Sequence, residues 1–262
     1  GLFFFKEDIR IDSISFDSLA PGNPQSPFYA TQEQSTKSWA AFGSLNYTVS
    51  EQLKLRAGLR YTSDKKDFAA RRVEATTAGP FVINNDSTNV SWDVSGTYAL
   101  NKDANLFARV ATGYRAPSMQ GRLNGLGDRP SFAAAEKALS WEAGIKQELF
   151  DRRARISANV FQYRVKDKQL TAGSGVINMN QLINADKVTG QGVELDFQAV
   201  LTDSLRMTLG GSYNDTEIKD GSLFVQQCGN FANTGGRAGC TVTDPAGPFP
   251  GTVRIDGNPM PR

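Results

Sequence analysis

Polar and apolar residues alternate along nine stretches of this chain. In the stretch 53–62, leucine, alanine and tyrosine at the odd positions oppose lysine, arginine and glycine at the even ones. Alternation with a period of two predicts β-strands whose two faces meet different environments. The other stretches lie near 1–17, 37–49, 90–98, 105–114, 139–146, 154–166, 193–201 and 205–214.

The connections between these stretches alternate along the chain between short and long. The short ones cover 50–52, 101–104, 151–153 and 202–204, and the long ones cover 18–36, 63–88, 115–137, 167–187 and 219–252. An antiparallel barrel that crosses a membrane has short turns on one side and long loops on the other. A soluble β-sandwich has no reason to sort its connections in this way. The alternation of short and long connections therefore predicts an all-β chain that is a segment of an antiparallel transmembrane β-barrel, with its long loops outside the cell.

Aromatic residues on the apolar face gather at both ends of the strands. Near the long connections stand Trp39, Tyr61, Trp92, Tyr114, Trp141 and Tyr213, and near the short turns stand Tyr47 and Tyr98. The eight residues from Trp39 to Tyr47 span about 19 Å of height at ~3.3 Å rise and ~45° tilt. That height is close to the ~25 Å apolar band of a membrane barrel, which aromatic girdles flank. The core of a soluble sandwich would instead scatter its aromatic residues along the strands.

The opposite face carries charges of both signs at the centres of the strands. They are Arg56, Arg60, Asp93, Arg109, Glu142, Lys146, Glu194, Asp196 and Arg206. Charges at that depth cannot face lipid cheaply, so they face water or a polar partner. Long charged side chains favour a large barrel, which holds a channel or a plug, although a solvated face of an open sheet would suit each of them individually. Phe107, Phe161 and Tyr163 interrupt the alternation, and the stretch 1–17 has no clear face.

The composition of the chain argues against several classes of function. Charged residues make up 21% of the chain, the net charge is +2 and the mean hydropathy is −0.39, so there is no basic excess for a nucleic acid to attract. The chain has no histidine, which excludes Ser-His-Asp and Cys-His catalysis, and phosphate-binding glycine motifs are missing. Glu194 and Asp196 share one face, but charges lining a lumen explain them more simply than acid–base chemistry. We expect neither an enzyme nor a bound cofactor.

Two cysteines, Cys228 and Cys240, lie in the last long connection among Gly, Asn and Pro. In an oxidising compartment such a pair suits a disulfide, worth ~3 kcal/mol in the loop-entropy model. Two free thiols are the alternative. A metal site is disfavoured, because two thiolates without histidine do not complete a tetrahedral shell.

The two ends of the chain suggest an internal piece of a longer protein. It opens in a strand, without Met or a signal peptide, and ends at Arg262 without a closing strand. Nine strands also cannot complete a bacterial barrel, whose strand count is even. We expect residues 1–262 to be a partial barrel domain.

Several segments resemble the TonB-dependent outer-membrane receptors. The strand-plus-loop segment 105–118 matches a motif of that family, as do the segments 58–61, 142–146, 190–194 and 256–259 in the same order. The resemblance implies a 22-stranded barrel with an N-terminal plug, of which this chain supplies about nine strands. It also implies import of a scarce ligand, commonly a ferric siderophore but also cobalamin or a glycan, with energy passed through TonB. The plug, the TonB-contact segment and the terminal strands are missing from this chain.

The expected partners are therefore a ferric siderophore or another small ligand, the lipid of the bacterial outer membrane, and the TonB complex acting through absent N-terminal parts. Arg115, Arg122 and Arg129 lie in one long connection and could attract an anionic ferric chelate, although solvated loop arginines are the alternative. Two other functions stay open. One is a passive porin, and the other is a soluble secreted adhesin or glycan-binding module.

Overall fold

The computed structural model describes residues 1–16, 25–73, 78–121, 129–173, 180–226 and 244–260. Its main element is a nine-stranded antiparallel sheet, which confirms the predicted number of strands. In spatial order the strands are β1 (Leu2–Phe16), β2 (Gln25–Thr48), β3 (Leu53–Val73), β4 (Ala78–Ala99), β5 (Ala104–Arg115), β8 (Glu136–Leu149), β9 (Ala154–Gly173), β10 (Asn180–Thr202) and β11 (Leu205–Lys219). No helix in the described part of the chain is long and apolar enough to cross a membrane.

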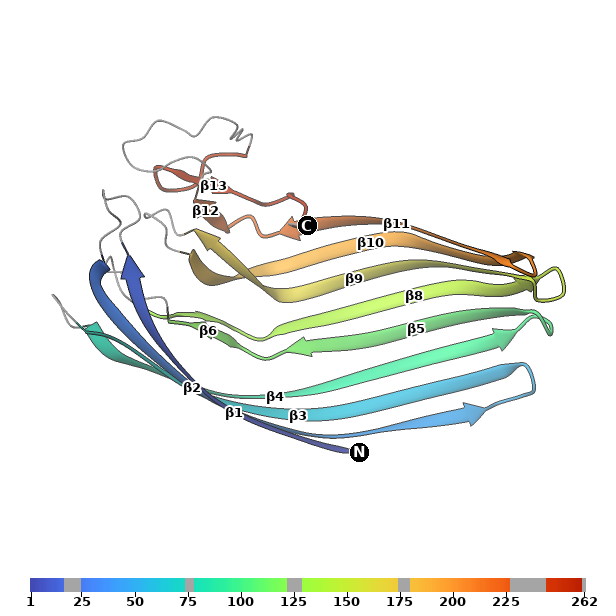
Figure 1. Cartoon of the computed structure of the whole chain (residues 1–262), viewed down its shortest axis with the longest axis horizontal. Coiled ribbons are helices and arrows are strands. Elements are labelled where there is room, and N and C mark those ends of the chain that lie inside the picture. Colours follow the sequence, from blue (N-terminus) through green and yellow to red (C-terminus); the bar gives the residue numbers. More distant parts are fainter. Residues whose placement is uncertain (17–24, 74–77, 122–128, 174–179, 227–243, 261–262) are drawn as a thin grey trace.

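The sheet is a curved, open wall (Figure 1). The strands of this sheet lie in chain order, with β6 and β7 left out between β5 and β8, and β1 and β11 form the two edges. The short turns lie at one end of the wall, and two small hairpins lie at the other. These hairpins are β6 (Ser118–Gln120) with β7 (Ser131–Ala133), and β12 (Phe224–Gln226) with β13 (Thr252–Arg254).

The short turns fall where the sequence predicts them, and side chains close them. Ser50 Oγ accepts hydrogen bonds from the backbone N–H of Gln52 and of Leu53, at 3.3 and 3.1 Å. Asn101 Oδ1 accepts one from the N–H of Asp103 at 2.9 Å. Such bonds from Ser and Asn to the nearby backbone favour turns over continued strands.

The strands extend much further toward the long connections than the alternation predicts. The stretch 53–62 becomes β3, which continues to Val73, and β2 begins at Gln25 rather than near residue 37. The predicted long connections 18–36 and 63–88 are therefore largely strand. Beyond an apolar band both faces of a hairpin are polar, so the periodic signal disappears while the backbone hydrogen bonds continue.

The apolar face of the sheet is exposed along the predicted band. Leu45 is 70% exposed, Leu59 59% and Trp141 53%. Soluble monomers rarely expose a continuous apolar patch of more than a few hundred Å², whereas lipid would cover such a face. We call this side the outward face and the opposite, polar side the inner wall.

Tyr114 does not belong to the outward aromatic girdle as predicted. Its hydroxyl lies 3.0 Å from Ser87 Oγ, because β5 separates from β4 beyond the pair Asp93–Ala111. At the separation the Thr112 hydroxyl accepts a bond from the N–H of Trp92 at 2.7 Å and donates one to its carbonyl at 3.1 Å. The Tyr114 ring thus fills the opening between the two strands.

Two small clusters of buried hydrophobic residues lie toward the long connections. One contains Ala30, Phe68 and Ala70, with Phe81, Ile83 and Met119 packed against it. The other contains Ala185, Val188 and Ile218. Within the apolar band the sheet has no second layer among the described residues, so its stability there depends on what covers its two faces.

Candidate functional site

The charges at the strand centres lie on the inner wall and are partly matched. Arg109 stands directly opposite Glu142 in the β5–β8 register. Asn159 Nδ2 donates a hydrogen bond to Glu194 at 3.3 Å. The Arg60 guanidinium lies 5.4 Å from the ring centroids of both Phe3 and Phe42, within the range of cation–π attraction.

The aromatic residues that interrupt the alternation cover glycines of the neighbouring strands. A Cβ added to Gly144 would lie 2.8 Å from the Phe107 ring, and one added to Gly192 would lie 2.7 Å from the Phe161 ring. A Cβ at Gly190 would overlap the Tyr163 ring. Glycine is therefore required where a ring lies flat across the adjacent backbone.

The residues that connect β5 to β8 fold back across the inner wall. Those that the structure describes are 116–121 and 129–135, which we call the bridging loop. Its anchor is Gln169 of β9, which is 6% exposed. The Gln169 amide nitrogen donates to the carbonyls of Ala116 and Ala134, both at 2.9 Å, and its oxygen accepts a bond from the Ser118 hydroxyl at 2.7 Å.

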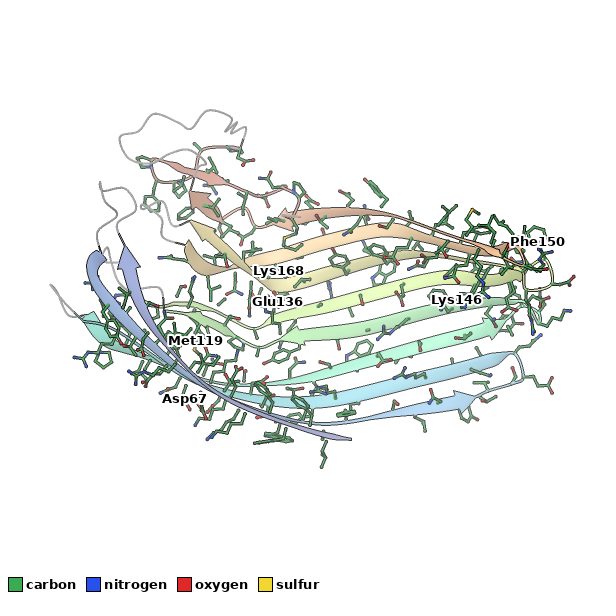
Figure 2. All side chains as sticks on the ribbon, in the orientation of Figure 1. Asp67, Met119, Glu136, Lys146, Phe150 and Lys168 are labelled. Atoms are coloured by element: carbon green, nitrogen blue, oxygen red, sulfur yellow. The ribbon has the colours of Figure 1, made fainter. Side chains whose placement is uncertain are left out.

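Asn184 also holds this side of the bridging loop, and Glu136, the first residue of β8 after the loop, contacts β9. Asn184 Oδ1 accepts a hydrogen bond from the N–H of Ala134 at 2.8 Å. Glu136 accepts the N–H of Gln169 at 2.9 Å and forms an ion pair with Lys168 at 3.3 Å. Figure 2 shows Glu136 and Lys168 next to each other, far from the short-turn end where Lys146 and Phe150 lie.

The other side of the bridging loop packs on β2 and β3. Met119 contacts the cluster of Ala30, Phe68 and Ala70. A Cβ added to Gly121 would lie 2.9 Å from Gln32 Oε1 and 3.1 Å from Ala70 Cβ. The loop therefore spans from β2–β3 to β9–β10 and narrows the space in front of the inner wall.

A cationic corner lies where the bridging loop leaves β5. Lys66 Nζ donates to the Pro117 carbonyl at 2.7 Å. Burial lowers the pKa of the half-buried Lys66 ammonium, and the charge of Arg115 lowers it further, although Asp64 and Glu7 oppose the shift. Lys66 and Arg115 are thus close enough for the charge of Arg115 to disfavour the charged form of Lys66.

The structure describes two of the three arginines predicted to bind ligand. Arg115 ends β5, is exposed and stands opposite Glu136 in the register. Arg129 is exposed at the far end of the bridging loop. Arg122 lies outside the described residues, as do Cys228 and Cys240, so the proposed disulfide stays a prediction.

The sequence did not single out Lys66 or Gln169. Both residues fall within predicted long connections, where the sequence was not interpreted as strand. Extending the two-residue period of 53–62 through 64–70 would have placed Asp64, Lys66 and Phe68 on one face.

Comparison with known proteins agrees with this architecture. The TonB dependent receptor-like β-barrel family model matches residues 4–262. The pesticin receptor of Yersinia pestis is 26% identical over 224 residues, covering 81% of this chain and 32% of that protein. The pesticin receptor of Yersinia enterocolitica matches with the same identity and coverage. This chain thus spans about a third of the curated relatives it matches.

Solved structures show the same fold. The ferric yersiniabactin uptake receptor FyuA from Yersinia pestis aligns with a TM-score of 0.66 and 23% identity, over 83% of this chain and 32% of that one. The ferric-catecholate import receptor Fiu from E. coli aligns with a TM-score of 0.59 and 14% identity, over 84% and 35%. At these identities the likeness concerns the fold. Because the family model covers nearly the whole chain, the protein is an outer-membrane β-barrel segment that belongs to the TonB-dependent receptor-like β-barrel family.

Proposed function

We propose that this chain forms part of the barrel wall of an outer-membrane receptor that imports a ferric siderophore. The observation that carries the proposal is the bridging loop, which is held on both sides and whose Pro117 carbonyl accepts a hydrogen bond from Lys66, close to Arg115. A passive channel can also carry a cationic constriction, so the uptake test below distinguishes the two functions. In this proposal residues 1–262 supply one stretch of the barrel domain, and the remaining length of the relatives corresponds to the plug, the TonB-contact segment and the other strands.

We assign the anionic groups of the ferric chelate to Lys66 and Arg115, with Arg122 and Arg129 attracting it from the same loop. A ferric complex of catecholate or carboxylate groups carries negative charge, and a cleft lined by cations raises its local concentration. The proposed role is binding and transport, without catalysis. TonB would act through the parts of the receptor outside this chain.

The test is uptake of radioactive iron by cells that express the complete receptor. Ferric catecholate, hydroxamate and phenolate siderophores are supplied one at a time, in cells with and without TonB. We expect saturable uptake of one class, lost without TonB. In the double variant Lys66→Gln/Arg115→Gln the apparent KM should rise about tenfold, because two charge-assisted contacts are lost. Lys54→Gln, on the same wall near the short turns, is the matched control.

Two outcomes would contradict the proposal. Non-saturable uptake that does not need TonB would favour the porin. If the complete protein is recovered from cells in aqueous buffer as a folded monomer without detergent, it is a soluble adhesin or glycan-binding module. Neutralising Arg115, Arg122 and Arg129 together tests all three arginines of the loop, and unchanged uptake would remove them, Arg115 included, from the site.

A further inference from the structure

Four lysines stand side by side across the strands β8 to β11. In the register of the sheet Lys137 lies opposite Lys166, Lys166 opposite Lys187, and Lys187 opposite Lys219. We call this the four-lysine row. A shorter row of the same kind crosses β1 to β3, where Lys37 stands between Lys6 and Lys65.

Both rows lie on the outward face. Lys137 has the same parity as Trp141 on β8, and Lys219 has the same parity as Tyr213 on β11. Likewise Lys37 has the parity of Trp39. All seven lysines are exposed. The other lysines lie on the inner wall, in a short turn or beside the bridging loop, namely Lys54, Lys66, Lys102, Lys146 and Lys168.

The rows are unfavourable within the sheet itself. Side chains directly opposite in an antiparallel pair have their Cβ atoms ~5 Å apart, and like charges there are destabilising. Nearby carboxylates balance the row on β1–β3 and only one end of the four-lysine row. Lys219 pairs with Glu217 at 2.9 Å and Lys6 with Asp8 at 3.0 Å, while Lys65 stands opposite Asp86.

The other three lysines of the four-lysine row have no such balance. Among the described residues, Lys137, Lys166 and Lys187 form no ion pair within 4.0 Å. Arg164, exposed on the same face two residues before Lys166, adds another cation. A partner that supplies negative charge from outside the sheet would remove this repulsion.

The height of the rows identifies that partner. The lysines lie two residues beyond Trp39, four beyond Tyr61 and Trp141, and six beyond Tyr213 along their strands. At ~3.3 Å rise and ~45° tilt these separations place them about 5–14 Å above the aromatic girdle. Aromatic girdles mark the edge of the hydrocarbon, and the headgroup layer follows directly. Lysine side chains extend toward such a layer.

We propose that the four-lysine row binds the phosphate groups of lipid headgroups in the outer leaflet of the membrane, and that the row on β1–β3 is a second, weaker site. Basic side chains near an anionic membrane surface each strengthen binding. The inference depends on the outward apolar band and is independent of the imported ligand.

The test measures lipid binding to the complete receptor in neutral detergent. The probe is a bis-phosphorylated glycolipid of the lipid A type, titrated by native mass spectrometry. Lys166→Gln/Lys187→Gln should weaken binding roughly thirtyfold, from the loss of two cations. Lys166→Arg/Lys187→Arg should retain binding. Lys54→Gln/Lys102→Gln is the control with equal charge change away from the row, and it should bind as the unaltered receptor does.

Two further measurements distinguish binding of the lipid from binding of a free anion. The same glycolipid with its phosphates removed enzymatically should bind at least tenfold more weakly, and inorganic phosphate at the same concentration should not displace the intact lipid. The proposal is overturned if the glutamine pair binds like the control pair. Equal binding of the dephosphorylated lipid, or displacement by inorganic phosphate, would also overturn it. Unchanged siderophore uptake by the glutamine pair would show that the two proposed sites are separate.

Discussion

Removing the Gln169 side chain should release the bridging loop from the inner wall. In Gln169→Ala the Ala116 carbonyl loses its donor and the Ser118 hydroxyl loses its acceptor. The Ala134 carbonyl keeps only the bond from Asn184 Nδ2 at 3.1 Å. The rest of β9 keeps its backbone pairing with β8 and β10, so the barrel wall itself should remain folded.

The three hydrogen bonds set the size of the effect. A hydrogen bond contributes about 0.5–1.5 kcal/mol net, and a buried partner left unpaired costs more. Because Gln169 is only 6% exposed, water does not readily replace it. We expect local opening of the loop to become easier by about 2–4 kcal/mol, which is a roughly 30- to 700-fold larger opening equilibrium.

Hydrogen exchange of the complete receptor in detergent measures this opening. Peptides that cover 116–121 and 129–135 should exchange faster in Gln169→Ala, while peptides from β10 near Val193 should not change. Thr171→Ala is the matched control, because Thr171 is exposed two residues further along the same strand.

Equal exchange in Gln169→Ala and Thr171→Ala, within about threefold, would refute the role of Gln169 as the anchor. Loss of protection throughout the sheet would also contradict it, because the structure confines the three bonds to the loop.

Three further outcomes follow from the structure. Gly190→Ala should destabilise the receptor by about 1–3 kcal/mol in denaturant unfolding, because its methyl group would overlap the Tyr163 ring, and the cost should fall in a Tyr163→Ala background. Leu209→Arg, on the outward face, should cost about 2–4 kcal/mol of folding free energy in lipid vesicles, whereas Thr208→Arg on the inner wall should cost little. Burial raises the pKa of Asp220, but hydrogen bonds from backbone N–H groups and a hydroxyl lower it overall. Its stabilisation should therefore be present above the unfolded pKa of ~3.9 and be lost as pH falls through the lower folded value, measured by hydrogen exchange at 218–223, and Asp220→Asn should remove this pH dependence.

The sequence alone determined the strand number, the short turns and which face is apolar. Each is a local property. Ser50 and Asn101 close their own turns, and alternation along a strand fixes the side on which Leu59 and Trp141 lie. The parity of one strand can be followed without knowing its neighbours, which is why these predictions hold.

The tertiary structure decided what depends on pairing between strands. Phe107 looked like an error in the alternation until the register placed it over Gly144. Gln169 lay in a predicted loop, and only the folded wall brings it to Ala116 and Ala134. The lysines of the four-lysine row are spread over 137–219 in the sequence. They become neighbours because antiparallel register joins residues that are distant along the chain, and no local pattern carries that information.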